Sequence, residues 1–521
     1  MGVASSNAAD PGVDGESPEQ LRLRAAVERA LVAAKPTEAK MPELQLCAEL
    51  LSGCEGCEPI ATALAELAEQ PERLSDLGSY ARAQLRAHRR VTAVYSEPVL
   101  EGLQMKCDEF DGIHTLRAAR VHPAVWNFRQ AKNGLPIYGV GQCHLDGLVY
   151  LARHLRQCGH MRVSCFNMRE EPIVFLNGTA CAPRVEGKLS ENVDYLCSIE
   201  GHELDAMESR LRDDCLQASK RSTDGLPVWF EVDGVNSQKM LHVYPEQSLP
   251  VRAAYEHVNE QEGAATVRYV RVPIADETAP EEQDFDQLVA EINPELALLT
   301  PSNDGGTALV FNCHMGRGRT TTGMACASIM LRVASGWSPT VGSSPTSLPD
   351  PMAPGRDLKR GAFSAILQLL SQLDNVGRRD GAGSGRGAGV DATDGVAGAG
   401  LGVRSKILVD LCADECDEVT HLVEAPSQCL QKAAAAAELE RSGGKSQRQK
   451  KQAPVKGPAE SSGTAAFWRQ RGVRYLERYA YMLLFAGYVQ LHLHGGFRLT
   501  FSEWMRKHWA FKRTMRDLAL S

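Results

Sequence analysis

The chain has 521 residues, of which 43% are hydrophobic and 23% charged, and a formal net charge of −8. This balance is typical of a soluble globular protein with room for two to four domains. A net acidic charge argues against a general nucleic-acid binder, which needs a basic surface. The 15 cysteines are an odd number with no disulfide-like framework, and no secretory segment opens the sequence. We therefore expect a reduced, cytoplasmic setting.

The first residues, Met-Gly-Val-Ala-Ser-Ser, match the myristoylation pattern at Gly2. The match is either accidental or predicts a lipidated N-terminus, and one acyl chain would give at most weak peripheral membrane association. Residues 1–19 are predicted to be disordered, and residues 20–91 have leucines at helical spacing and are predicted to form a helical segment. Cys54-Glu-Gly-Cys57 lacks the second pair that a four-ligand zinc site needs, so no metal is expected there.

From residue 92 onward, strand-like and helical patterns follow one another. An amphipathic helix is expected at 145–157, and two strands within 161–178 flank Arg169-Glu170-Glu171. This charged tripeptide is interpretable either as a salt bridge between strands or as a substrate contact. The next predicted elements are a charged helix at 190–220, strands at 227–231 and 239–244, and a helix at 246–262.

A predicted strand at 267–274 runs out into an acidic loop that contains Asp276, Glu277 and Pro280. A carboxyl group at this place could protonate a leaving oxygen and later take a proton from water. The alternative is a helix N-cap ahead of a helix at 281–288, where acidic side chains are favoured by the helix dipole.

The segment 308–324 combines a buried strand, a glycine loop and the start of a helix. Backbone N–H groups and the positive end of a helix dipole converge on such a loop, which predicts an anion site. The loop residues are His314, Met315, Gly316, Arg317 and Gly318. Cys313 precedes them, and its thiolate would be stabilised as a nucleophile. The alternative, a structural cysteine before a glycine turn, leaves Arg317 and Arg319 without a role.

Two low-complexity stretches interrupt the sequence after this helix. Residues 336–403 are predicted to be a linker with a Gly/Ala-rich insert at 378–402, and residues 404–521 a helical extension with a disordered insert at about 430–463. Helices are expected at 361–374, 405–425, 464–493 and 500–519. The apolar run Ala480–Val489 is too short to span a membrane and is expected to pack in the core.

The segment 312–324 resembles the signature of the cysteine-dependent phosphatases of the protein-tyrosine-phosphatase superfamily. It reads Asn-Cys-His-Met-Gly-Arg-Gly-Arg-Thr-Thr-Thr-Gly-Met. It looks most like the paladin family, which is related to the phytase-like members. The resemblance covers about residues 92–335 well and 404–519 more loosely. One departure is Asn312, which stands where the superfamily usually has histidine, and this puts the depth of thiolate activation in question.

The resemblance implies an α/β fold, with a twisted mixed sheet flanked by helices on both faces and residues 92–335 as the phosphatase-like domain. It also implies a nucleophilic Cys313, an Arg319 that clamps two phosphate oxygens, and a Thr320 hydroxyl that helps the thiolate leave. Asp276 matches the general acid of the family, with Glu277 as the alternative. No cofactor and no metal are implied.

The predicted function is hydrolysis of phosphate monoesters through a cysteinyl-phosphate intermediate. His314 and Arg317 make the loop basic, which suits a substrate with several phosphates, such as an inositol phosphate or a phosphoinositide. A phosphoprotein substrate stays open. The alternative is a catalytically weak or inactive pseudophosphatase that serves as a phosphate-binding scaffold.

Overall fold

The computed structural model describes residues 99–100, 102–108, 122–193, 199–232, 235–261, 263–299, 306–338, 357–383, 400–416, 422–442 and 464–518. Contacts divide the chain into Met1–Ala93 and Val94–Ser521, and every element below belongs to the second unit. Gly2, the predicted segments 1–19 and 20–91, and the pair Cys54 and Cys57 lie outside the described residues.

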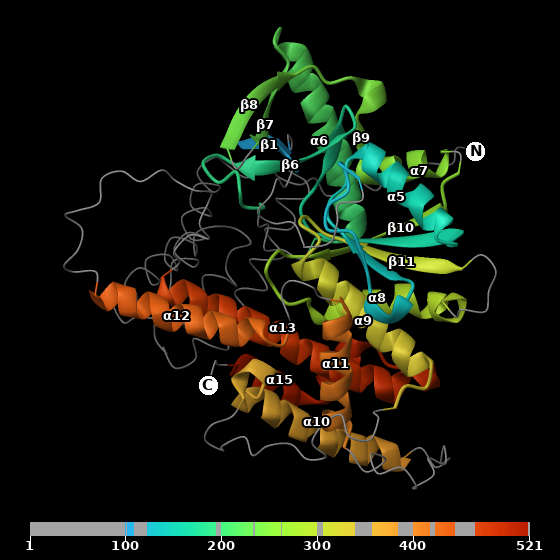
Figure 1. Ribbon diagram of the computed structural model, residues 1–521, viewed down its shortest axis with the longest axis vertical. Helices are drawn as coiled ribbons and strands as arrows, with labels where there is room; N and C mark the ends of the chain where they lie inside the picture. The colour runs from blue at the N-terminus through green and yellow to red at the C-terminus, as the bar shows by residue number, and fades with distance from the viewer. Residues whose placement is uncertain are drawn as a thin grey trace, which may run out of the picture. The chain divides into compact units, whose positions relative to one another are not determined.

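A mixed five-stranded sheet organises the described part of the chain (Figure 1). Its strands, in spatial order, are β10 (Thr266–Ile274), β4 (Arg162–Arg169), β11 (Thr307–Asn312), β3 (Ile137–Val140) and β2 (Arg129–Gln130). The first four strands are parallel, and β2 runs antiparallel to β3. The carboxyl ends of the parallel strands therefore meet at one edge, where ligands bind in open α/β sheets.

Helices cover both faces of this sheet, because its strands direct apolar side chains to both faces. Along β11, Leu309 and Phe311 join one core cluster and Ala308 and Val310 the other. The first face is covered by α8 (Glu282–Ile292) and α9 (Gly318–Ala334), and the second by α5 (Leu145–Gln157) and α7 (Val251–Asn259). The predicted α/β fold with helices on both faces is confirmed.

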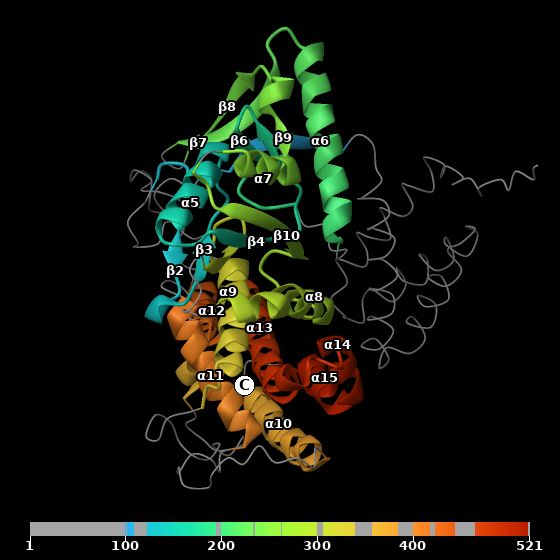
Figure 2. The ribbon, with the colours of Figure 1, turned by 90° about the vertical axis from the view of Figure 1, so that its right-hand side faces the viewer.

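A second sheet of six strands lies next to the first in the described part of the chain (Figure 2). Its strands are β8 (Val235–Leu241), β7 (Leu226–Val232), β1 (Leu103–Cys107), β6 (Thr179–Val185), β5 (Val174–Leu176) and β9 (Leu249–Pro250). Helix α6 (Gly201–Arg221) packs against it. Strand patterns within 161–178, at 227–231 and at 239–244 indicated β5, β7 and β8, but not the sheet, and the last prediction was displaced, because β8 ends at Leu241. Its assembly depends on β1 pairing with both β6 and β7.

The C-terminal helices extend the core of the first sheet. They are α10 (Ser364–Gly383), α11 (Leu401–Cys416), α12 (Ala425–Ser442), α13 (Ala465–His492), α14 (Phe501–Lys507) and α15 (Trp509–Arg516). Phe485 of α13 packs on Phe285 of α8 with ring centroids 5.1 Å apart. The run Ala480–Val489 packs in the core, as predicted; all of its residues are buried except Tyr481, which is partly buried. Among the described helices, none combines the length and apolarity that crossing a bilayer requires.

Short 3-10 helices join several of these elements; they are Lys132–Gly134, Pro245–Gln247, Asn293–Leu298, Leu358–Arg360 and Leu493–Gly495. The 3-10 helix Pro245–Gln247 stands where the first turn of the helix at 246–262 was predicted, so the prediction is wrong for that turn. The helix begins only at Val251 because Pro250 has no backbone N–H and favours the position before a helix. The helix predicted at 190–220 likewise begins at Gly201, after a capping box formed by Glu200 and Glu203.

The two predicted inserts are shorter than the sequence indicated. Helix α10 continues to Gly383, and α11 begins at Leu401, so both ends of the insert at 378–402 are helical and residues 384–399 lie outside the described residues. Helix α12 occupies the start of the insert at 430–463, because its alanine run has the lowest helical cost and its buried Cys429 and Ala433 face the core. The predicted disorder is wrong for these residues.

Candidate functional site

The signature loop, residues 313–319, connects β11 to α9 as the sequence predicted. Cys313 follows the last strand residue and is buried, with 3% of its surface exposed. Helix α9 begins at Gly318, so Arg319 and Thr320 occupy its first turn, where orphan N–H groups and the helix dipole favour an anion. Gly316 has a φ of 74°. A Cβ there would collide with the backbone of Gly141 and lie 2.6 Å from the carbonyl carbon of Val140.

Four consecutive carbonyls of the signature loop accept hydrogen bonds from outside the loop or from α9. The donor and acceptor pairs are Gln142 N to His314 O at 2.8 Å, Asn127 Nδ2 to Met315 O at 2.7 Å, Arg129 Nη1 to Gly316 O at 2.6 Å, and Thr321 N to Arg317 O at 2.9 Å. With its carbonyls turned to these donors, the loop directs its N–H groups to the opposite side, as in an anion-binding nest.

Arg129 is a residue of this site that sequence reasoning missed. Besides Gly316 it donates from Nη2 to Thr321 Oγ1 at 2.9 Å and from Nε to the carbonyl of Cys416 at 3.1 Å. Its side chain thus connects the back of the signature loop to the end of α11. A lone arginine on a two-residue edge strand carries no sequence signal for such a role.

Arg319 is fixed from two strands that neighbour each other. Its Nη1 and Nη2 donate to the two carboxylate oxygens of Glu171 at 2.8 and 2.9 Å, and Nη1 also donates to the carbonyl of Ile274 at 3.0 Å. Burial opposes its charge, but Asp276 and Glu171 together raise the pKa of Arg319 well above its usual value. Its Nε is buried without a hydrogen-bond partner among the described residues.

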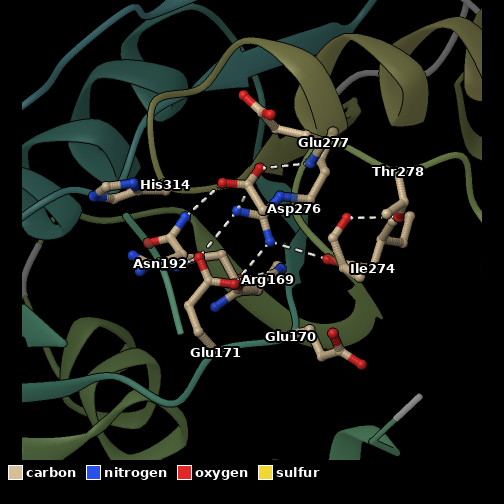
Figure 3. Close-up of polar contacts among 12 residues, drawn as sticks. Arg169, Glu170, Glu171, Asn192, Ile274, Asp276, Glu277, Thr278 and His314 are labelled. Carbon is tan, nitrogen blue, oxygen red and sulfur yellow. Dashed lines mark hydrogen bonds and ion pairs between the residues drawn. The ribbon is translucent and has the colours of Figure 1, made fainter. Parts of the chain in front are cut away.

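Asp276 meets Arg319, the last residue of the signature loop, with its Oδ1 3.3 Å from Arg319 Nη2. Its Oδ2 accepts a hydrogen bond of 2.6 Å from Asn192 Nδ2 (Figure 3). Partial burial raises the pKa of Asp276, but the charge of Arg319 and the hydrogen bond from Asn192 outweigh it and hold that pKa below the usual value. The side chain remains 43% exposed, so a ligand could reach it.

Glu277 takes a different direction from Asp276. Its φ of 57° is in the left-handed region, and its carboxylate forms an ion pair of 2.6 Å with Arg471 of α13. Figure 3 shows the two neighbouring carboxylates pointing apart. Of the two predicted acids, the geometry therefore favours Asp276. The alternative of an N-cap role for Asp276 is wrong, because Glu281 caps α8 in a capping box with Asp284.

His314 differs from its expected role as a titratable cation of the loop. Its Nε2 lies 3.0 Å from Asp108 Oδ1 and 3.2 Å from Arg184 Nη2. Burial lowers the pKa of His314 and outweighs the opposite effect of Asp108. The shift disfavours the charged form of the ring. Arg317 is the partly exposed cation that the loop itself contributes beside Arg319.

Beneath Arg319 lies a buried ionic cluster that sequence reasoning found only in part. Arg169 donates from Nη1 to Asp108 Oδ2 at 2.5 Å and from Nε to Glu171 Oε1 at 3.0 Å, and Arg184 reaches the other Asp108 oxygen at 2.9 Å. Arg169 and Glu171 are thus members of buried ion pairs, in line with the salt-bridge interpretation, whereas Glu170 Oε1 accepts a hydrogen bond of 3.3 Å from the backbone N–H of Ile199. Asp108 and Arg184 come from the second sheet and gave no signal in the sequence.

Two further polar groups of the site are buried without partners among the described residues. They are the Thr320 hydroxyl and Asn312 Oδ1. The first is the hydroxyl that the resemblance assigns to thiolate release. Within the described part of the chain, no group of three His, Cys, Asp or Glu side chains could hold a metal ion.

Comparison with known proteins supports the resemblance that the signature loop suggested. Residues 166–331 match the family model of the protein-tyrosine-phosphatase-like phytases, which is described as "Inositol hexakisphosphate". Paladin of Homo sapiens is 26% identical over 397 residues, which cover 73% of this chain and 39% of that protein. Paladin of Gallus gallus is 26% identical over 395 residues, or 73% and 38%. The matched part of the chain thus spans well under half the length of these relatives.

Two solved structures also match this chain, with low TM-scores. The tandemly repeated protein-tyrosine-phosphatase-like phytase of Mitsuokella multacida aligns with a TM-score of 0.39 and 13% identity, over 86% of this chain and 56% of that one. A phytase of the same type from Bdellovibrio bacteriovorus aligns with a TM-score of 0.28 and 15% identity, over 44% and 68%. The resemblance to the paladin family and its phytase-like relatives, inferred from the signature, is confirmed.

Proposed function

We propose that this paladin-like chain is a cysteine-dependent phosphatase that hydrolyses phosphate monoesters. The observation that carries the proposal is the meeting of Asp276 and Arg319 at 3.3 Å on the loop that Cys313 opens. The candidate acid follows β10, yet it reaches the proposed anion clamp, which follows β11 together with the proposed nucleophile. The matches to paladin and to the phytase-like family model support it.

In the proposed reaction the Cys313 thiolate attacks phosphorus, so that an S–P bond forms as the P–O bond to the leaving group breaks. Arg319 and the loop N–H groups hold the nonbridging oxygens, whose charge is stabilised by donors already in place. Asp276 gives its proton to the leaving oxygen. It then accepts a proton from water, which attacks phosphorus and releases phosphate and the thiolate. Thr320 hydrogen-bonds the departing sulfur.

The ionised state of Asp276 is the main electrostatic obstacle to this scheme, because an acid must carry a proton. Arg319 lowers the pKa of Asp276 in the free protein. A phosphate dianion bound to Arg319 would offset that positive charge and add negative charge beside the carboxylate, and both effects raise the pKa. Substrate binding would therefore help to protonate the acid that it needs.

We further propose that the substrate is a polyphosphorylated inositol or phosphoinositide, with a phosphoprotein as the alternative. Support comes from the inositol hexakisphosphate that the matched family model names and from Arg317, which adds a cation beside the clamp. His314 gives less support than the sequence suggested, because burial disfavours its charged form and Asp108 already engages its ring. A cytoplasmic location, with weak membrane attachment through Gly2, remains part of this proposal.

The second candidate function is a phosphate-binding scaffold without turnover. Two observations favour it: Asn312 replaces the usual histidine, and Asp276 is held ionised by Arg319. An intact Cys313, Arg319 and Thr320 argue for catalysis instead.

Phosphate release from a panel of inositol phosphates, phosphoinositides and phosphopeptides separates the two functions. We expect turnover of at least one class, and loss of it by more than about 1,000-fold in Cys313→Ser, since no thiolate is left to attack. Cys158→Ser, at an exposed cysteine, is the matched control and should keep the activity. Vanadate binding that depends on Cys313 and Arg319, without turnover of any substrate, would leave the scaffold as the function.

A further inference from the structure

Helix α13, which belongs to the C-terminal helical extension, contacts the acid loop, residues 275–281. Arg478 donates to the carbonyl of Thr278 from Nη2 at 2.7 Å and from Nε at 3.2 Å. About two turns earlier on the same helix, Arg471 Nη2 lies 2.6 Å from Glu277 Oε1. The two residues directly after Asp276 are thus each held by an arginine of α13.

The two arginines share one face of α13 with an aromatic ring between them. Residues 471, 475 and 478 are spaced so that they line one side of a helix. The Tyr475 ring lies 5.8 Å from Arg471 Cζ and 5.5 Å from Arg478 Cζ, and its hydroxyl accepts a hydrogen bond of 3.4 Å from Arg471 Nε. Such contacts restrict the arginine side chains before they meet the loop.

Arg478 also adjoins the signature loop. It is buried, with 3% of its surface exposed, and a Cβ on Gly318 would lie 3.3 Å from its Nη1. Burial lowers the pKa of Arg478, although Tyr475, Asp276 and Glu277 oppose that effect, and a guanidinium stays charged. One guanidinium therefore lies between the start of α9 and the acid loop.

The acid loop needs outside contacts because its backbone is strained. Glu277 has a φ of 57°, a left-handed conformation that is unfavourable for a residue with a side chain and persists only where the surroundings enforce it. Inside the loop, Asp276 Oδ1 accepts from Glu277 N at 3.1 Å and Thr278 Oγ1 donates to Ala275 O at 2.9 Å. The contacts from α13 close this turn from outside.

We propose that Arg471 and Arg478 form a latch on α13 that positions the acid loop, and with it Asp276, over the signature loop. This inference rests on the proposed function, in which Asp276 is the acid. The two arginines are positioning residues, since they hold the loop backbone and Glu277. The latch also gives the C-terminal extension a part in the reaction, although the matched family model ends at residue 331.

Leaving-group dependence distinguishes this role from a merely structural one. Arg478→Met and Arg471→Met should lower the turnover of phenyl phosphate by about 10²-fold, the scale of general acid catalysis, and that of p-nitrophenyl phosphate much less, because its leaving oxygen needs less protonation. Asp276→Asn should show the same pattern. Arg469→Met, at an exposed arginine of α13, should change neither rate. Equal losses for both substrates in the latch variants would overturn the proposal.

Hydrogen–deuterium exchange of residues 275–281 in the full chain tests the latch without requiring turnover. With vanadate bound, Arg478→Met and Arg471→Met should raise exchange in this loop by at least several-fold, while Arg469→Met does not. Unchanged exchange in both latch variants would overturn the latch even if the protein is an active phosphatase. A wild-type protein without turnover, but with exchange that rises in both variants, would keep the latch and refute the proposed function.

A charge exchange guards against variants that simply fold poorly. Arg471→Glu alone places two carboxylates together and should loosen the acid loop. Combining it with Glu277→Arg restores an ion pair with reversed charges and should return exchange toward the wild-type level. Failure of the double variant to recover, at an unchanged melting temperature, would count against the latch.

Discussion

At the scale of single residues, Glu171 has the most demanding position in the site. Its carboxylate accepts hydrogen bonds from both Arg319 and Arg169, and its side chain is only 2% exposed. Burial raises the pKa of Glu171, but Arg319 and Arg169 lower this pKa by more than burial raises it, so that it lies well below the usual range. Removing this charge would take one counterion from each of two buried guanidinium groups, Arg319 and Arg169.

Glu171→Gln should therefore destabilise the fold by about 3–5 kcal/mol, the cost of breaking a buried ion pair. In the wild type, the unfolded chain takes up a proton at this group near pH ~4.3 while the folded chain does not. The stabilising contribution is thus present above that pH and is lost as the pH falls through the folded pKa. Urea unfolding at neutral and acidic pH measures both effects, and the variant should lose less stability on acidification.

The matched control for this prediction is Glu291→Gln. Glu291 pairs with Arg268 at 2.7 Å, but the two side chains are 33% and 45% exposed, so the loss should stay below about 1 kcal/mol. If Glu171→Gln costs no more than this control, the buried cluster does not depend on Glu171.

At the scale of elements, the unit of function is β11, the signature loop and α9, pressed against β3. Gly316 allows the close approach of the loop to Gly141, and the carbonyls of the loop are held by donors from neighbouring segments. Gly336, which lies just after the end of α9, also has a φ of 74°, but no atom lies within 4 Å of the position that a Cβ would take. Substituting each glycine therefore distinguishes the cost of the left-handed backbone, which both share, from the cost of a steric clash, which only Gly316 has.

Both Gly316→Ala and Gly336→Ala should cost about 1–2 kcal/mol for the left-handed conformation. Only Gly316→Ala should also weaken the binding of inorganic phosphate or vanadate, by more than about tenfold, because its Cβ pushes the loop away from β3. Calorimetric titration with melting temperatures measures both. Equal phosphate affinity in the two variants would show that the close approach at Gly316 is not needed.

At the scale of the whole molecule, the described C-terminal helices and the first sheet share one hydrophobic core. Phe485 of α13 contacts Phe285 of α8, with ring centroids 5.1 Å apart, and Phe501 of α14, with centroids 6.0 Å apart. Arg478 lies on the same helix as Phe485 and binds the acid loop. Packing of the C-terminal helices therefore affects the position of the acid loop.

Phe485→Ala should cost about 3–5 kcal/mol through the cavity that it opens. Because the core is shared, α13 and the signature loop should unfold together. The urea midpoint of unfolding should then fall by the same amount whether it is measured by intrinsic fluorescence or by loss of phosphate binding. Trp509→Ala, at a side chain 67% exposed, is the control with little expected effect. Two separate transitions would show that the extension folds independently.

By itself, the sequence determined the local features of this protein. The strand at β11, the glycine loop, the helices α5 and α13 and the positions of Cys313, Arg319 and Asp276 followed from periodicity, glycine placement and a specific signature. These patterns involve only a few neighbouring residues, so they can be recognised in the sequence without knowledge of the fold. The second sheet was not predicted as a sheet, and helical residues were misread as inserts, because pairing and packing lie outside such patterns.

Only the tertiary structure decided which groups meet. The parallel strands β10, β4 and β11 place Asp276, Glu171 and Cys313 at one edge, since their carboxyl ends lie side by side. Strand β1 of the second sheet leads into Asp108, which engages His314, and α13 brings Arg478 to the acid loop. The partner of a buried charge depends on strand register and helix packing, which the spacing of residues along the chain does not encode.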